Sequence, residues 1–366
     1  MNALKAALAG ILIASSQAQN PTEVGALQPG FYRADDARFS FLGRYEAGNP
    51  KQPRFAFPGS GFEVRFSGVS LSLAIVSDSD TSALTVVIDH GDPTLKLLRK
   101  GEQVVSLATE LNDGPHTVEV YKRTEAWQGV VTLLGLQVAS GGRLLDPPPL
   151  PTRKLMFVGD SVTCGEGVNN NATCTPDPAS PSNDAYHGYG MDLGRRLDAQ
   201  VHLVCYGGRG LVRDYRGLGK SDGVLNAPEF LDLSIPSDEP ANRAVWDHKK
   251  WIPDGIVVSV GTNDFNLETT VPLNGDAFVD EYLKFLKSLR GQYPNATVFA
   301  TEGAIVTDPL LRRYVQDAVG RAQDSRILWV PATHYPGNGC NGHPTREQHH
   351  RIADDLEPVL RKALTW

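Results

Sequence analysis

Four residues with the side chains or backbone freedom for one shared reaction lie in the second half of the chain: Ser161, Gly208, Asn263 and His343. Each comes after a short, mostly apolar run. If these runs are parallel strands of one open sheet, the residues that follow them gather at the carboxyl edge, where such sheets bind ligands. The spacing therefore predicts a single site that is built from four distant segments.

The residue types at this site point to acyl transfer. A serine hydroxyl becomes a strong nucleophile only when a base removes its proton, and His343 has a suitable side chain because imidazole titrates near neutral pH. The oxyanion that forms on the attacked carbonyl needs preorganised donors. The backbone N–H groups of Ser161 and Gly208 and the amide of Asn263 could supply three. Glycine at position 208 also permits close approach of the backbone to a substrate.

The elements that must position these residues alternate between strand and helix. The apolar runs lie at 155–158, 201–205, 256–260, 298–300 and 327–330, and they have the composition of parallel strands that are buried on both faces. Apolar residues at helical spacing occupy 278–289 and 311–318, and Thr345-Arg346-Glu347-Gln348 matches a capping box. The pattern predicts a doubly wound sheet of about five parallel strands.

The region before residue 146 has a different period. Alternation of apolar and polar residues predicts strands at 62–66, 70–76, 84–89, 103–109, 117–121 and 130–138, with clusters of turn residues between them. This region therefore reads as an all-β sandwich or jelly roll. Asp-Pro-Pro-Pro-Leu-Pro at 146–151 favours an extended linker. We place a β-sandwich domain with its linker at 19–150 and the catalytic domain at 151–366.

Composition and charge exclude several partners. Hydrophobic residues make up 41% of the chain, and 35 basic against 42 acidic residues give a net charge of −7. The chain is therefore ordinary globular protein without the basic surface that nucleic acids require. No Cys or His spacing is typical of a zinc site. We expect no metal, no organic cofactor, no membrane span and a monomer.

The N-terminus and the four cysteines predict export. Residues 1–18 contain Lys5, a short apolar stretch and a small-x-small end, which together are typical of a signal peptide. In an oxidising extracellular or periplasmic compartment, Cys164, Cys174, Cys205 and Cys340 permit two disulfides in three pairings. Cys164 and Cys174 are closest in sequence and could close one loop. Asn171 and Asn295 begin glycosylation sequons, which matter only in a eukaryotic secretory pathway.

These blocks carry a family resemblance. Gly159-Asp160-Ser161, Gly208, Gly261-Thr262-Asn263-Asp264 and His343 resemble the four sequence blocks of the SGNH (GDSL) hydrolases. The segments at 41–44, 49–61, 113–119 and 122–125 resemble the N-terminal β domain of carbohydrate esterase family 2, which includes acetyl xylan esterases. The segments 208–213 and 339–344 are similar to the same family. The resemblance extends from about residue 30 to the C-terminus.

The resemblance implies a secreted serine esterase with a jelly roll followed by a flavodoxin-like SGNH domain. Its substrate would be an O-acetylated plant polysaccharide such as xylan or glucomannan. Ser161 is then the nucleophile, His343 the base, and Ser161, Gly208 and Asn263 the oxyanion hole. An esterase or lipase of longer acyl chains and a non-catalytic glycan-binding protein are the alternative functions.

One position departs from the SGNH pattern. Many of these enzymes carry an aspartate three residues before the histidine, but Cys340 stands there and Asn341 follows it. The loop 331–343 contains no carboxylate. We predict a Ser–His dyad in which a main-chain group or Asn341 contacts the second ring nitrogen of His343, with a carboxylate from a distant loop as the alternative.

Several further residues have both a functional and a structural interpretation. We assign Asp160 and Asp264 structural roles beside Ser161 and Asn263. Core packing is favoured over sugar stacking for Trp127, Trp246 and Trp251. Packing or surface positions are favoured for His349 and the other histidines. Arg209 and Arg213 read equally well as cleft or surface residues. If Cys164 or Cys340 forms a disulfide, the bridge braces the rim of the site.

Overall fold

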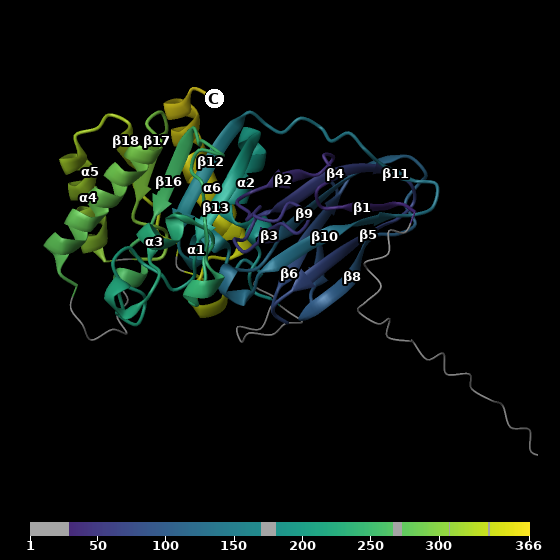
Figure 1. The fold of residues 1–366 in the computed structure, drawn as a ribbon. Helices are drawn as coiled ribbons and strands as arrows, with labels where there is room; N and C mark the ends of the chain where they lie inside the picture. Colours follow the sequence, from purple (N-terminus) through teal and green to yellow (C-terminus); the bar gives the residue numbers. More distant parts are fainter. Residues whose placement is uncertain (1–28, 170–180, 266–272, 307, 336) are drawn as a thin grey trace, which may run out of the picture.

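The computed structural model describes residues 29–169, 181–265, 273–306, 308–335 and 337–366. The expected signal peptide, Cys174 and the sequon at Asn171 lie outside the described residues. Figure 1 shows two layers of antiparallel strands beside a parallel sheet that is flanked by helices. Both halves of the predicted fold are therefore confirmed: an antiparallel β-sandwich and an α/β unit with a parallel sheet.

The sandwich consists of two antiparallel sheets. The first has the order β1 (Phe31–Arg33), β10 (Val131–Val138), β5 (Leu71–Ser77) and β8 (Gly101–Ala108), with β3 (Arg54–Phe55) paired to β10. The second has the order β11 (Arg143–Leu145), β4 (Gly61–Ser67), β9 (Pro115–Lys122), β6 (Ala83–Ile88) and β7 (Thr94–Leu97), with β2 (Ser40–Leu42) paired to β4. Alternate side chains of the long strands meet between the sheets, as their period of two requires.

The parallel sheet has the order β13 (Ala199–Cys205), β12 (Arg153–Gly159), β16 (Gly255–Ser259), β17 (Thr297–Thr301) and β18 (Ile327–Trp329). Counted within this sheet, the order is 2-1-3-4-5, which is that of flavodoxin-like folds. The helices are α1 (Ser161–Cys164), α2 (Tyr189–Leu197), α3 (Ala227–Leu231), α4 (Gly275–Gln292), α5 (Pro309–Ala322) and α6 (Arg346–Leu364). A short hairpin, β14 (Leu233–Ile235) with β15 (Ala244–Val245), follows α3.

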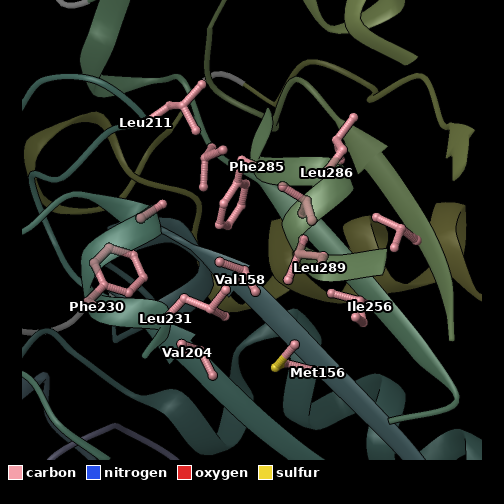
Figure 2. Close-up of a cluster of buried hydrophobic side chains, with 14 of the residues drawn as sticks. Met156, Val158, Val204, Leu211, Phe230, Leu231, Ile256, Phe285, Leu286 and Leu289 are labelled. Carbon is pink, nitrogen blue, oxygen red and sulfur yellow. The ribbon is translucent and has the colours of Figure 1, made fainter. Parts of the chain in front are cut away.

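Both faces of the parallel sheet are covered. Met156 and Val158 face α3, α4 and α5, whereas Leu155 and Phe157 face α2 and α6. Figure 2 shows the first of these clusters, where Phe285, Leu286 and Leu289 of α4 lie over the strands. The near-continuous apolar character of the strands follows from this two-sided burial. The capping box at Thr345 is confirmed, because its hydroxyl accepts the Gln348 N–H and its own N–H is bound by the Gln348 side chain.

The sandwich and the α/β unit are packed against each other through buried polar contacts. Arg44, between β2 and β3, is 1% exposed and donates to the carbonyl oxygens of Leu231 and Leu233. Its guanidinium lies 4.8 Å from the ring centroid of Trp246. Burial lowers the pKa of Arg44 to about 10. Arg44 thus joins the sandwich to the α/β unit, which supplies both carbonyl oxygens and the ring.

One disulfide joins the ends of two neighbouring strands. Cys164, in α1 after β12, is bonded to Cys205 at the end of β13, with 5.6 Å between their Cα atoms. The pairing of Cys164 with Cys174 that sequence proximity suggests is therefore wrong. Parallel pairing aligns Gly159 with Cys205, so the fold and not the chain distance selects the partner. Cys340 is also disulfide-bonded.

We predict that the Cys164→Ala/Cys205→Ala variant has a free energy of unfolding about 3–4 kcal/mol below that of the oxidised wild-type protein. The bridge closes a loop with a sequence separation of 41 residues, which restricts the unfolded chain. Urea unfolding of both proteins at equal pH measures the difference. Equal free energies of unfolding in the variant and the oxidised wild-type protein would contradict the prediction.

Candidate active site

The residues that chemistry singled out come together at the carboxyl edge of the parallel sheet. In register, Gly159 of β12 pairs with Cys205 of β13 and with Ser259 of β16. The loops that carry Ser161, Gly208 and Asn263 therefore leave three adjacent strands at the same level. Strand register thus brings the starts of these three loops to one edge of the sheet, as the apolar runs predict.

Ser161 and His343 form a direct pair. The Ser161 Oγ lies 2.7 Å from the Nε2 of His343, and Ser161 is 6% exposed. Ser161 is the first residue of α1, and the preceding Asp160 caps this turn by accepting the Val162 N–H at 3.0 Å. Asp160 therefore has the structural role assigned to it. The strand-to-helix turn presents the hydroxyl to the ring, which is the geometry of a nucleophile and its base.

The second ring nitrogen of His343 is bound by the main chain. Its Nδ1 lies 3.0 Å from the carbonyl oxygen of Cys340, which leads the short turn Cys340–Gly342. A carbonyl there fixes the tautomer with hydrogen on Nδ1, so Nε2 is free to accept the serine proton. Gly167 makes room for the base, since a Cβ there would lie 2.6 Å from the His343 Cβ. Of the alternatives left open, the main-chain contact is the one found.

A carboxylate does reach the histidine, but on the side that faces the serine. The Glu166 Oε2 lies 3.5 Å from the His343 Nε2, and Asn341 donates to the other Glu166 oxygen at 3.4 Å. Sequence reasoning missed Glu166 because it searched the loop before the histidine. The signal that could have found it is its position five residues after Ser161, close in the chain to the nucleophile. A negative charge at this position stabilises the imidazolium that forms when the ring takes a proton.

The other two residues of the predicted oxyanion hole, Gly208 and Asn263, are connected through the Gly208–Arg209 segment. Gly208 has a φ of +74°, a left-handed conformation that favours glycine, and its carbonyl oxygen accepts the Tyr215 N–H. The Asn263 Nδ2 donates to the carbonyl oxygen of Arg209 at 2.9 Å, which orients the amide beside the Gly208 segment. Since an amide nitrogen carries two N–H groups, this bond leaves one to bind an oxyanion.

Asp264 binds the backbone of the segment that follows Gly208. It is completely buried, and its carboxylate accepts the N–H groups of Leu211, Val212 and Arg213 at 2.7, 2.9 and 3.1 Å. Burial raises the pKa of Asp264 to about 6, while the three backbone donors act in the opposite direction. The side chain thus ties the third block of the site to the segment after Gly208, which is a structural role.

The structure decides between buried and exposed positions for two arginines and three tryptophans. Arg209 and Arg213 are 7% and 8% exposed, so the surface interpretation is wrong. Arg209 pairs with Asp238 at 2.8 Å. Trp246 and Trp251 lie in the core as expected, whereas the expectation of core packing is wrong for Trp127, which is 49% exposed.

The described residues contain neither a candidate metal-binding cluster nor a helix that could span a membrane. Within them, no group of three or more His, Cys, Asp or Glu side chains is arranged to hold a metal ion. No described helix is both long and apolar enough to cross a lipid bilayer.

Comparison with protein families divides the chain into two matching regions. A family described as carbohydrate esterase 2 N-terminal matches residues 41–148. The GDSL-like lipase/acylhydrolase family matches residues 157–363. The two matches coincide with the sandwich and with the α/β unit that carries Ser161 and His343.

Individual relatives match over nearly the whole chain. An acetylxylan esterase/glucomannan deacetylase of Cellvibrio japonicus is 34% identical over 91% of each chain. The cellulase/esterase CelE of Acetivibrio thermocellus is 30% identical over 91% of this chain but only 40% of its own length. Among solved structures, a family two carbohydrate esterase from Cellvibrio japonicus has a TM-score of 0.84, with 32% identity over 92% of this chain and 98% of that one.

Proposed function

The chain belongs to carbohydrate esterase family 2, and from this membership we propose that it is an O-acetylesterase that deacetylates plant polysaccharides such as xylan and glucomannan. The observation that carries the proposal is the 2.7 Å contact between the Ser161 Oγ and the His343 Nε2 in the α/β unit. The name of the 34% identical relative supports the substrate class.

The proposed reaction proceeds through an acetyl-enzyme. The His343 Nε2 takes the Ser161 proton while Oγ bonds to the acetyl carbon, and the carbonyl oxygen becomes an oxyanion. The N–H groups of Ser161 and Gly208 and the Asn263 amide stabilise that charge. When the intermediate collapses, the carbon–oxygen bond to the sugar breaks and the imidazolium returns its proton to the sugar oxygen. Water then attacks the acetyl carbon with His343 as the base, and the bond to the Ser161 Oγ breaks to release acetate.

His343 works here without a carboxylate on Nδ1. The Cys340 carbonyl holds the ring orientation, and Glu166 supplies negative charge beside Nε2 while the ring is protonated. A carbonyl dipole stabilises imidazolium less than a carboxylate does. The position of Glu166 offsets part of this difference, because the positive charge of the imidazolium is spread over both nitrogens.

Acetate release from a panel of substrates tests the proposed function. Acetylated xylan, acetylated glucomannan and acetylated cello-oligosaccharides are incubated with the enzyme, and NMR identifies the hydroxyl positions that lose acetate. A 4-nitrophenyl ester series from acetyl to octanoyl measures acyl preference, and kcat/KM is expected to fall steeply beyond acetyl. A preference for octanoyl would support an esterase of longer acyl chains, and polysaccharide binding without turnover would support a binding protein.

The setting of the activity is part of the proposal. Action outside the cytoplasm is supported by the Cys164–Cys205 disulfide, because such bonds persist in oxidising compartments. We retain the monomeric state, the domain division at residue 150 and the signal peptide at residues 1–18 as predictions. Size-exclusion chromatography with light scattering tests the first of these.

A further inference from the structure

A carboxyl group from the sandwich reaches the loop that carries the Gly208 donor. Glu125 leads the 3₁₀ turn η1 (Ala126–Gln128) after β9, and it is 0% exposed. Its Oε2 accepts the N–H of Gly207 at 2.6 Å, and its Oε1 accepts the Nδ2 of Asn183 at 3.0 Å. Both partners belong to the α/β unit, so this side chain spans the contact between the two units.

The loop is shaped to receive this carboxyl. A Cβ at Gly207 would lie 2.5 Å from the Glu125 Oε2, so only glycine permits the approach. Gly207 and Gly208 are consecutive, and two glycines together have more backbone freedom than any other pair. A peptide that must aim the Gly208 N–H at a developing oxyanion therefore needs an external partner to hold it. Glu125 binds the peptide directly before that donor.

Glu125 is itself firmly held. The buried Lys122 donates through Nζ to the carbonyl oxygens of Thr124 and Glu125, each at 2.7 Å. Gln128 accepts the Glu125 N–H at 2.9 Å. One residue before Thr124, Arg123 pairs with Asp184 of the α/β unit at 2.8 Å. The main chain of Glu125 is thus held within the sandwich, and its carboxyl group is bound by the α/β unit.

From these contacts we propose that Glu125 is a positioning residue of the active site, supplied by the sandwich to hold the Tyr206–Gly207 peptide so that the next peptide presents the Gly208 N–H to the oxyanion. The inference rests on the proposed function and deepens it. The sandwich then takes part in catalysis through one side chain, whatever glycan contacts it makes. Burial, and after it the nearby Glu166 carboxylate, raise the pKa of Glu125 to about 8. Glutamine keeps one acceptor oxygen, which can still bind the Gly207 N–H.

Kinetics of Glu125→Leu and Glu125→Gln in the full chain test the proposal. Leucine has a similar size but cannot accept the Gly207 N–H, so kcat for 4-nitrophenyl acetate is expected to fall about 10–100-fold with KM within about twofold, because a misplaced donor loses only transition-state stabilisation. Glutamine keeps an acceptor and is expected to retain kcat within about threefold. The Ki of methylboronic acid, which forms a tetrahedral adduct on the serine, is expected to rise in parallel with the loss of kcat/KM.

Arg44→Met is the matched control for a general loosening of the contact. Arg44 is as deeply buried as Glu125, but its partners are the carbonyls of Leu231 and Leu233, away from the glycine loop. We expect a lower melting temperature and a kcat within about threefold of wild type. If Glu125→Leu does not fold, Asn183→Ala, which frees one carboxyl oxygen, is expected to give a smaller loss of kcat.

Three results would overturn the proposal. They are an unchanged kcat in folded Glu125→Leu, a loss that appears only in KM, and an equal loss of kcat in Arg44→Met. Wild-type protein that does not hydrolyse 4-nitrophenyl acetate would remove the proposed function and this inference with it. An active wild type with an equally active Glu125→Leu variant removes only the inference.

Discussion

Ser161→Ala protein is expected to fold normally and to hydrolyse acetate esters at least about 10⁴-fold more slowly than wild type. The substitution removes only the hydroxyl group, whose oxygen lies 2.7 Å from the His343 Nε2 in the described structure. Without it, no acetyl-enzyme can form, and only substrate binding and the oxyanion donors can still accelerate attack by water. Initial rates with 4-nitrophenyl acetate and with acetylated xylan measure the loss.

His343→Ala is expected to cost nearly as much as Ser161→Ala, and the double variant no more than either single one. Nucleophile and base act as a unit, so removing one makes the other useless, and the losses are not additive. Losses that add in the double variant would show that Ser161 and His343 act independently and would falsify the dyad.

Ser259→Ala is the control for replacing a buried serine near the site. Ser259 ends β16, pairs in register with Gly159 and is 7% exposed. Its side chain is hydrogen-bonded to Tyr189, which we assign no part in the reaction, so kcat is expected to stay within about threefold of wild type. Unfolding curves for the three serine and histidine variants and this control separate loss of chemistry from loss of structure.

Local patterns in the sequence predicted both units of the fold and the four central site residues. Buried parallel strands are apolar on both faces, so their ends are visible as the points where polar residues begin, and Ser161, Gly208 and Asn263 stand at such points. The strand order puts these ends side by side. The ends of the apolar runs therefore predict which residues lie at the edge of the sheet.

The residues that could not be predicted depend on contacts between distant segments. Glu125 looks like any acidic residue after a strand until the packing of sandwich and α/β unit brings it to Gly207. The Cys205 partner of Cys164 follows from strand register, and the burial of Arg209 from its pairing with Asp238. No local period encodes these distances, so they emerge only once the tertiary structure is known.

Asn263→Ala is expected to lower kcat about 10²–10³-fold, with KM changed by less than about threefold. The amide nitrogen donates one N–H to the Arg209 carbonyl, and in the proposed oxyanion hole the second N–H binds the oxyanion. The hydrogen bond from this second N–H to the oxyanion strengthens as charge develops. Its loss therefore raises the free energy of the transition state more than that of the bound substrate, by about 3–4 kcal/mol. Steady-state kinetics on 4-nitrophenyl acetate give kcat and KM separately.

Methylboronic acid and a second asparagine, Asn274, make this test specific to the oxyanion. The tetrahedral boronate places an oxygen where the oxyanion develops, so its Ki is expected to rise as kcat/KM falls in Asn263→Ala. Asn274 caps α4 by accepting the Ala277 N–H at 3.2 Å, and Asn274→Ala is expected to cost about 1 kcal/mol of stability without changing kcat. If Asn263→Ala raises KM and leaves kcat and the boronate Ki unchanged, the amide binds substrate in the ground state, and the Ser161 and Gly208 N–H groups alone must stabilise the oxyanion.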